Sequence, residues 1–284
     1  MLSKFDYFKP QNLEEAIAYL KENPGTRILA GGTDLMILLR RNIEIVDHIL
    51  DIKSISETKR MEYTPGEGLF IGASITVNQV AESEIIREKY EALAQAADSL
   101  ASYQLRNRAT LVGNICNASP GADLSGPLLI FNSKVHIAGP NGNRTVEIDK
   151  FFTGVKRTVL QPDEIVVGVS IPDVEEGDKS IYLKQARIKG HDLGIAGVAI
   201  RITASKEVFI GMSAVAPTPI RLTKLEEMMA SKELTPELAN WVEEELRNHI
   251  RPISDVRSSA EYRLHVSGVL AKKGLTQLLE KGVN

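Results

Sequence analysis

A pair of adjacent glycines follows a short apolar run and precedes a segment with helical character. The segment reads, in order, Ile28, Leu29, Ala30, Gly31, Gly32, Thr33, Asp34 and Leu35. Paired glycines let a backbone approach a ligand closely, and consecutive free N–H groups form an anion-binding concavity. A helix that begins directly behind the turn adds a favourable dipole. The segment predicts a pyrophosphate-binding loop, and a plain turn with Thr33 or Asp34 as a helix N-cap is the open alternative.

A second polar segment, Gln104 to Asp123, lies between apolar runs in the middle of a predicted domain. It is rich in Asn, Ser, Gly and Pro, so we predict that it is mostly loop. An irregular polar segment inside a domain must satisfy its backbone groups, and a bound polar ligand is one solution. We expect the following residues to form a second close-approach loop: Thr110, Leu111, Val112, Gly113 and Asn114.

Asp123 is the carboxylate nearest to this second loop on its C-terminal side. A carboxylate beside a phosphate-binding loop often accepts hydrogen bonds from ribose hydroxyls. Alternatively, Asp123 caps a helix that begins near Leu124. Two close-approach loops in one domain favour a dinucleotide, because its pyrophosphate can be bound from two sides. They do not distinguish FAD from NAD.

Composition excludes several classes of protein. With 43% hydrophobic and 25% charged residues in 284, the chain has an ordinary globular composition and enough length for two domains. A net charge of −3, with Lys and Arg scattered among acids, argues against a nucleic-acid partner. No apolar run is long enough to span a membrane. The N-terminal residues lack an apolar export signal, so we expect a cytoplasmic location.

Cys116 is the only cysteine, which excludes an internal disulfide and a cysteine-ligated iron–sulfur cluster within this chain. The five histidines have no metal-binding spacing, so we expect no metal site. No nucleophile or acid–base constellation is evident, and we expect no catalytic side chain in the usual sense.

Hydrophobic periodicity predicts a mixture of helices and strands. Helices are expected over 13–21, 35–41, from about 77, over 90–99, and from 220 to the C-terminus, ending in 258–279. Strands are expected over 27–30, 47–51, 69–73 and 165–171, with a hairpin over 135–148. Three further strands, 180–188, 194–203 and 207–214, follow an acidic stretch that resembles a domain boundary.

The two loops together resemble the flavoprotein (medium) subunit of xanthine dehydrogenase, carbon monoxide dehydrogenase and related molybdenum hydroxylases. The similarity extends over almost the whole chain, in the family's order. The matching stretches are Ala30 to Leu35, Ile71 to Thr76, Gln104 to Asp123, Asp163 to Ile165, Lys184 to Arg187 and Ala260 to Arg263.

This resemblance implies an α+β protein that binds FAD non-covalently. The FAD-binding domain would cover residues 1–175, in two lobes of about 1–55 and 56–175, with the fold of vanillyl-alcohol oxidase and p-cresol methylhydroxylase. The C-terminal domain, residues 176–284, would be a three-stranded antiparallel sheet with helices, like that of the CO dehydrogenase flavoprotein.

The resemblance also implies roles for individual residues. Residues 28–35 would enclose the FAD pyrophosphate and ribityl, and residues 110–114 would form the facing loop. Asp123 would contact the adenosine part, and Ile165 would give a backbone or apolar contact to the flavin. Lys184 would lie near the isoalloxazine edge, where a cation stabilises negative charge on reduction; a solvated strand lysine is the alternative.

The sequence departs from the family pattern at two places. The family usually has two glycines before the asparagine of the second loop, and here the first is Val112. Some relatives carry a tyrosine that covers one flavin face within the segment corresponding to Lys189 to Gly194. Here the candidates are Asp192 and Leu193.

By resemblance, the chain is the flavin subunit of a molybdenum hydroxylase. A molybdopterin large subunit would oxidise an organic substrate, and electrons would pass through 2Fe–2S clusters of a small subunit to FAD in this chain. NAD+ or another acceptor would take them, in a heterotrimer or a dimer of heterotrimers. The alternatives are an autonomous FAD-dependent oxidase of the vanillyl-alcohol-oxidase type and a flavin-free scaffold subunit.

Overall fold

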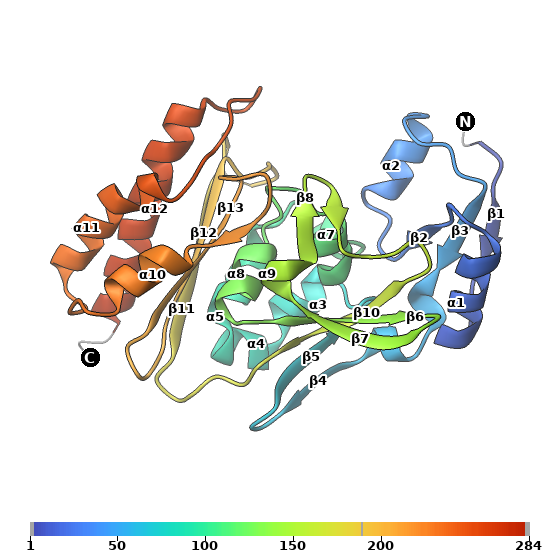
Figure 1. Cartoon of the computed structure of the whole chain (residues 1–284), viewed down its shortest axis with the longest axis horizontal. Helices are drawn as coiled ribbons and strands as arrows, with labels where there is room; N and C mark the ends of the chain where they lie inside the picture. The colour runs from blue at the N-terminus through green and yellow to red at the C-terminus, as the bar shows by residue number, and fades with distance from the viewer. Residues whose placement is uncertain (1–2, 189, 282–284) are drawn as a thin grey trace.

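Three structural parts follow one another along the long axis of the protein (Figure 1). The computed structural model describes residues 3–188 and 190–281, so the start of the first predicted domain and the end of the second lie outside the described residues. We call the parts the N-terminal lobe (residues 6–59), the central lobe (residues 61–171) and the C-terminal unit (residues 179–281). The mixture of parallel and antiparallel sheets with separate helices confirms the α+β class.

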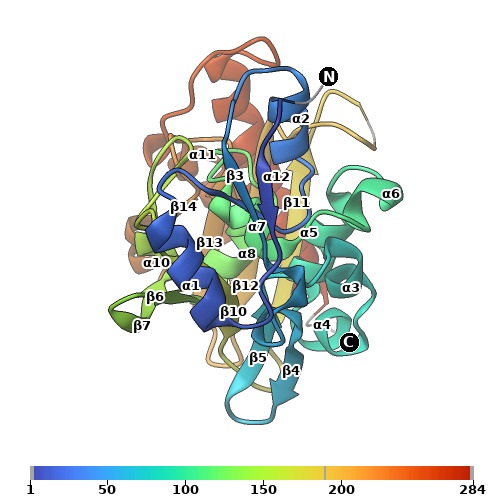
Figure 2. The same ribbon diagram turned by 90° about the vertical axis from the view of Figure 1, so that its right-hand side faces the viewer.

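The N-terminal lobe is a small parallel sheet with crossover helices, shown in blue in Figure 2. Its strands lie in the order β1-β3-β2. Asn12 begins the first helix, because its side chain accepts a hydrogen bond from the Glu15 N–H at 2.8 Å. The strand–helix–strand pattern predicted here is confirmed, and the three-residue β1 is additional. The elements are β1 (Asp6–Phe8), α1 (Leu13–Glu22), β2 (Arg27–Leu29), α2 (Leu35–Arg40), β3 (His48–Asp51) and the 3₁₀ turns η1 (Ile52–Ser54) and η2 (Glu57–Lys59).

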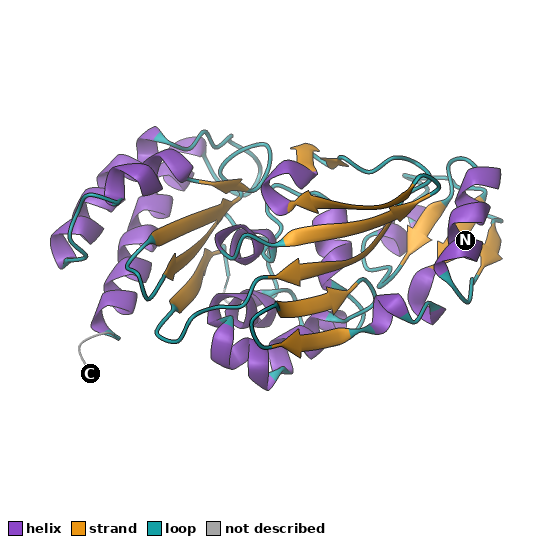
Figure 3. Ribbon diagram, turned by 60° about the horizontal axis from the view of Figure 1, so that its bottom comes forward, coloured by secondary structure: helices purple, strands orange, loops and turns teal. Residues whose placement is uncertain are grey.

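The central lobe is built on an antiparallel sheet whose strands lie in the order β4-β5-β10-β6-β7 (Figure 3). Its strands are β4 (Met61–Thr64), β5 (Gly68–Gly72), β6 (Lys134–Gly139), β7 (Gly142–Glu147) and β10 (Ile165–Ile171), with a small ribbon of β8 (Phe152–Gly154) and β9 (Arg157–Thr158). Its helices are α3 (Val77–Glu82), α4 (Glu84–Lys89), α5 (Glu91–Ser99), α6 (Tyr103–Arg106), α7 (Leu111–Cys116), α8 (Ser125–Ile130) and α9 (Ile148–Phe151). Helices α5 and α8 lie between this sheet and the C-terminal sheet (Figure 1).

The C-terminal unit is an antiparallel sheet enclosed between two helix layers. Helix α12 packs on β11 and β12, while α5 and α8 of the central lobe cover the opposite face. Burial on both faces explains why β12 is almost entirely apolar. The three predicted strands are present, and a two-residue fourth strand extends the sheet. The elements are β11 (Lys179–Gln185), β12 (Ala196–Ile202), β13 (Val208–Ser213), β14 (Ile220–Arg221), α10 (Thr223–Met229), α11 (Pro236–Glu245), η3 (Leu246–Asn248) and α12 (Ala260–Glu280).

The segment predicted as mostly loop, residues 104–123, contains most of α6 and all of α7. Its remaining residues, 107–110 and 117–123, lie outside helices and named strands, so the prediction holds for just over half of the segment and missed the two helices. Helices of four and six residues are too short for hydrophobic periodicity to reveal them. Instead, they begin at side-chain caps from Ser102 and Thr110.

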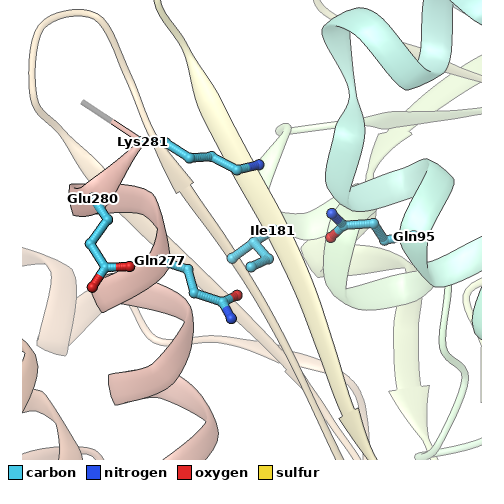
Figure 4. Close-up of a pocket in the computed structure, with 5 residues that line it drawn as sticks. All are labelled: Gln95, Ile181, Gln277, Glu280 and Lys281. Atoms are coloured by element: carbon cyan, nitrogen blue, oxygen red, sulfur yellow. The ribbon is translucent and has the colours of Figure 1, made fainter. Parts of the chain in front are cut away.

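Figure 4 shows the junction at which the end of α12, strand β11 and helix α5 meet. Lys281 forms an ion pair with Glu91 of the central lobe at 2.9 Å. The Gln95 side-chain oxygen accepts the backbone N–H of Tyr182 at 2.7 Å. These contacts connect the C-terminal unit to helix α5 at one edge of the sheet.

A close helix crossing in the C-terminal unit gives a stability prediction. A β-carbon added to Gly268 of α12 would lie 2.2 Å from the Glu243 carbonyl oxygen of α11. We expect Gly268→Ala to lower the free energy of unfolding by about 1–3 kcal/mol, because the helices must separate. Denaturant titration measures this, and Gly154→Ala is the control, since its nearest neighbour would lie at 4.0 Å. Equal stability of the two variants would contradict the tight crossing.

Candidate FAD site

The first predicted loop lies where the sequence placed it, between the end of β2 at Leu29 and the start of α2 at Leu35. Gly32 has φ +75°, a conformation that favours glycine. A β-carbon on Gly31 would lie 2.0 Å from the Arg108 carbonyl oxygen. The glycine pair therefore permits direct backbone contact with the segment that leads into Thr110. The structure brings the two predicted loops together.

The second predicted loop is the first turn of α7. Thr110 is its N-cap and accepts the Gly113 N–H at 2.9 Å. A β-carbon on Gly113 would lie 2.8 Å from that hydroxyl oxygen, so the cap favours glycine there. Leu111 and Val112 are buried in the hydrophobic core, which leaves only their backbone atoms for a ligand.

Asn114 offers an unused polar atom at the same place. Its side-chain oxygen is buried and has no hydrogen-bond partner among the described residues. A buried acceptor without a donor costs about 1–3 kcal/mol, and a ligand hydroxyl or N–H would satisfy it. The glycine-lined contact and this acceptor fit a polar dinucleotide such as FAD.

A lysine that was not predicted from the sequence holds the first loop in place. Lys53 donates to the Ala30 carbonyl at 3.1 Å and pairs with the buried Asp51 at 2.7 Å. Tyr7 also donates a hydrogen bond to Asp51. Burial opposes ionisation of Asp51, but the bonds from Lys53 and Tyr7 outweigh it and lower the pKa of the carboxyl. In the sequence, the only indication of this role is the position of Lys53, two residues beyond a buried strand.

Asp123 and Lys184 form a buried ion pair, with 2.8 Å between the ammonium nitrogen and a carboxylate oxygen. Their side chains are 7% and 8% exposed. Tyr182 donates to the other oxygen of Asp123 at 2.8 Å. Burial raises the pKa of Asp123, while Lys184 and Tyr182 oppose that rise. Because burial disfavours the charged carboxylate, the ion pair depends on the bonds from both Lys184 and Tyr182.

Two sequence-based expectations for Asp123 need correction. It does not cap α8, which begins at Ser125 without a side-chain cap. Nor can Asp123 contact the adenosine while Lys184 lies at the isoalloxazine edge of an extended FAD, because the two side chains touch each other. Against an extended FAD, the two side chains would contact the same part of the cofactor.

Ile165 begins β10 and is completely buried in the central core. Its side chain packs among core residues. The fold therefore favours the predicted backbone contact with the flavin over the predicted apolar side-chain contact. Of the candidates for covering a flavin face, Asp192 is bound by Arg187 at 2.9 Å, and these bonds hold its pKa well below the usual range. Leu193 is 58% exposed and offers a free apolar side chain. Lys189 of this segment lies outside the described residues.

Two surface depressions lie elsewhere, on the C-terminal unit. One is the small pocket at the α5–β11–α12 junction (Figure 4), and the other lies between the β12–β13 turn and α10. Neither is lined by a predicted site residue. They do not compete with the two loops as the cofactor site.

Comparison with known proteins assigns the class. Residues 3–174 match the family described as FAD binding domain in molybdopterin dehydrogenase, and residues 181–278 match the CO dehydrogenase flavoprotein C-terminal domain. The chain therefore belongs to the FAD-binding subunit family of the xanthine dehydrogenase and CO dehydrogenase type, a family of oxidoreductase subunits. This confirms the resemblance, with FAD as the cofactor of this subunit.

Individual relatives match this chain over nearly its full length. The xanthine dehydrogenase FAD-binding subunit of Escherichia coli O157:H7 is 33% identical over 276 residues, covering 95% of this chain and 94% of that protein. The carbon monoxide dehydrogenase medium chain of Hydrogenophaga pseudoflava is 30% identical, covering 96% of each. A solved structure of carbon monoxide dehydrogenase from Hydrogenophaga pseudoflava, lacking the Mo-pyranopterin moiety, has a TM-score of 0.93 at 29% identity and covers 99% of each chain.

Among the described residues, no helix has both the length and the apolar character needed to cross a bilayer.

The contact between the loops gives a binding prediction. Gly31→Ala places a methyl group against the Arg108 carbonyl, so the loops must separate. We expect FAD affinity to fall about tenfold or more, which corresponds to about 1.4 kcal/mol. Titration of flavin fluorescence measures the affinity, with circular dichroism to verify folding. The control is Gly154→Ala, and unchanged affinity in Gly31→Ala would argue against a pyrophosphate site at this contact.

Proposed function

We propose that this chain binds FAD non-covalently and is the electron-transfer subunit of a molybdenum hydroxylase. Two observations carry the proposal: the backbone contact of Gly31 with Arg108, which joins the two predicted loops, and the unpartnered side-chain oxygen of Asn114 in the second loop. When bound, FAD supplies the redox chemistry, because it accepts single electrons and releases pairs. The polypeptide binds and orients it and sets the local charge.

Residues 28–35 and the backbone of residues 110–114 hold the pyrophosphate and ribityl in this proposal. Lys53 fixes the first of these loops through the Ala30 carbonyl. Asp123 and Lys184 face the flavin part together, and Ile165 contributes a backbone contact. The Lys184 ammonium stabilises negative charge that develops when the flavin is reduced.

We propose the partners from the family to which the chain belongs. Because one cysteine cannot ligate an iron–sulfur cluster, we assign the clusters to a small subunit and molybdopterin to a large one, as the family resemblance implies. Names of relatives such as carbon monoxide dehydrogenase medium chain support a multi-subunit enzyme. We further propose a cytoplasmic complex, a heterotrimer or a dimer of heterotrimers, with NAD+ or another acceptor as the electron sink.

Non-covalent binding is tested by a visible absorption spectrum of the purified chain before and after acid precipitation. We expect flavin bands in the supernatant, because no covalent link holds the cofactor. Flavin retained in the pellet would contradict non-covalent binding. No flavin after incubation with added FAD would contradict the proposed function itself.

Lys184→Met tests the charge at the flavin. We expect the two-electron midpoint potential of the bound flavin to fall by about 30 mV or more, which equals a tenfold change in the equilibrium constant. The cause is the loss of a cation that favours the reduced, negatively charged flavin. Lys179→Met, on the same strand, is the matched control. Equal potentials in both variants would place Lys184 away from the flavin.

A further inference from the structure

The hydroxyl of Tyr182 has no role in the function proposed so far. It is buried, with 5% of the residue exposed, and it donates to the Asp123 oxygen that Lys184 does not bind. Each carboxylate oxygen thus has one partner from strand β11. Two partners on opposite oxygens fix the carboxylate against rotation, which a single ion pair does not.

The sheet is shaped to admit this hydroxyl. Lys184, Gly197 and Ser213 are in register across β11, β12 and β13. A β-carbon on Gly197 would lie 2.7 Å from the Tyr182 hydroxyl and 2.4 Å from the Ser213 hydroxyl. The missing side chain at Gly197 therefore provides the space in which Tyr182 reaches Asp123 across the neighbouring strand.

The surroundings of Asp123 leave few other means of stabilising its charge. Among the described residues, the titratable groups that contact it are Lys184 and Tyr182, both from β11. Helix α5 contributes the Ser99 carbonyl, which accepts a bond from Lys184 at 3.3 Å. Strand β12 is preceded by Gly194, which brings no charge. Without the Tyr182 hydroxyl, one carboxylate oxygen would be buried without a donor.

We infer that Tyr182 is a positioning residue that keeps Asp123 ionised and oriented, and through Asp123 fixes the Lys184 ammonium toward the flavin. The inference rests on the proposed function, since it requires that the Asp123–Lys184 pair faces FAD. Tyr182 itself acts through Asp123 and need not touch the cofactor.

The test uses Tyr182→Phe in the full chain, which removes the hydroxyl and retains the ring. With FAD as the probe, we expect about tenfold weaker binding, which corresponds to about 1.4 kcal/mol of binding free energy. We also expect that, as the pH is lowered, the visible spectrum of the bound flavin changes at a higher pH in Tyr182→Phe than in the wild type. The sign follows from the pKa: loss of a donor to the charged form lets Asp123 take up a proton earlier as the pH falls.

The matched control is Tyr90→Phe. Tyr90 is also buried, but its hydroxyl donates to the Pro172 carbonyl at 3.1 Å and does not contact Asp123. Gly197→Ala is an independent variant, because its methyl group would displace the Tyr182 hydroxyl while the tyrosine remains. We expect Gly197→Ala to reproduce both effects of Tyr182→Phe.

The outcomes separate this inference from the proposed function. If Asp123→Asn and Lys184→Met alter the flavin spectrum while Tyr182→Phe and Gly197→Ala behave like Tyr90→Phe, the role of Tyr182 is wrong and the site stands. If Asp123→Asn and Lys184→Met leave affinity, spectrum and potential unchanged, the pair does not face FAD, and the inference is overturned together with that part of the proposed function.

Discussion

The buried ion pair between Asp123 and Lys184 constrains how the C-terminal unit can sit against the central lobe. Removing two charges from water is costly unless they meet at short distance with further hydrogen bonds. Asp123 precedes α8 and Lys184 belongs to β11, so the pair forms only when this sheet lies against the helix layer of the central lobe. Any displacement of the sheet would leave a carboxylate buried without its cation. The ion pair thus connects domain packing to the charge beside the proposed flavin site.

A second buried cation acts at the same end of the sheet as Lys184. Arg263 is 2% exposed and donates to the carbonyls of Ile195 and Ala214, at the ends of β12 and β13. The Ala214 N–H in turn donates to the Pro120 carbonyl at 2.6 Å. Pro120 lies three residues before Asp123, so α12 helps to hold the segment that carries the carboxylate.

Local patterns in the sequence predicted the parts of the site that depend on local structure. The strand, glycine pair and helix around Gly31 form because each element is determined by neighbouring residues. Long-range pairing was not predictable in this way: Asp123 and Lys184 are 61 positions apart, and only the fold shows that they touch. Tyr182 was missed because a tyrosine in a strand is ordinarily a core residue. Its polar role depends on the empty space at Gly197, which belongs to a different strand.

The valine at position 112 bears on whether this member of the family retains its flavin site. A second glycine at this position would suit a loop in which the backbone meets phosphate. Its replacement by valine is therefore the sequence feature that favours the flavin-free scaffold alternative. In the structure, position 112 lies in α7, where Val112 is 4% exposed and packs in the core. Residues two positions apart on a helix point in nearly opposite directions, so Val112 and Asn114 occupy different faces. The valine therefore packs in the core on the face of the helix opposite to Asn114, and it gives no reason to expect that FAD is lost.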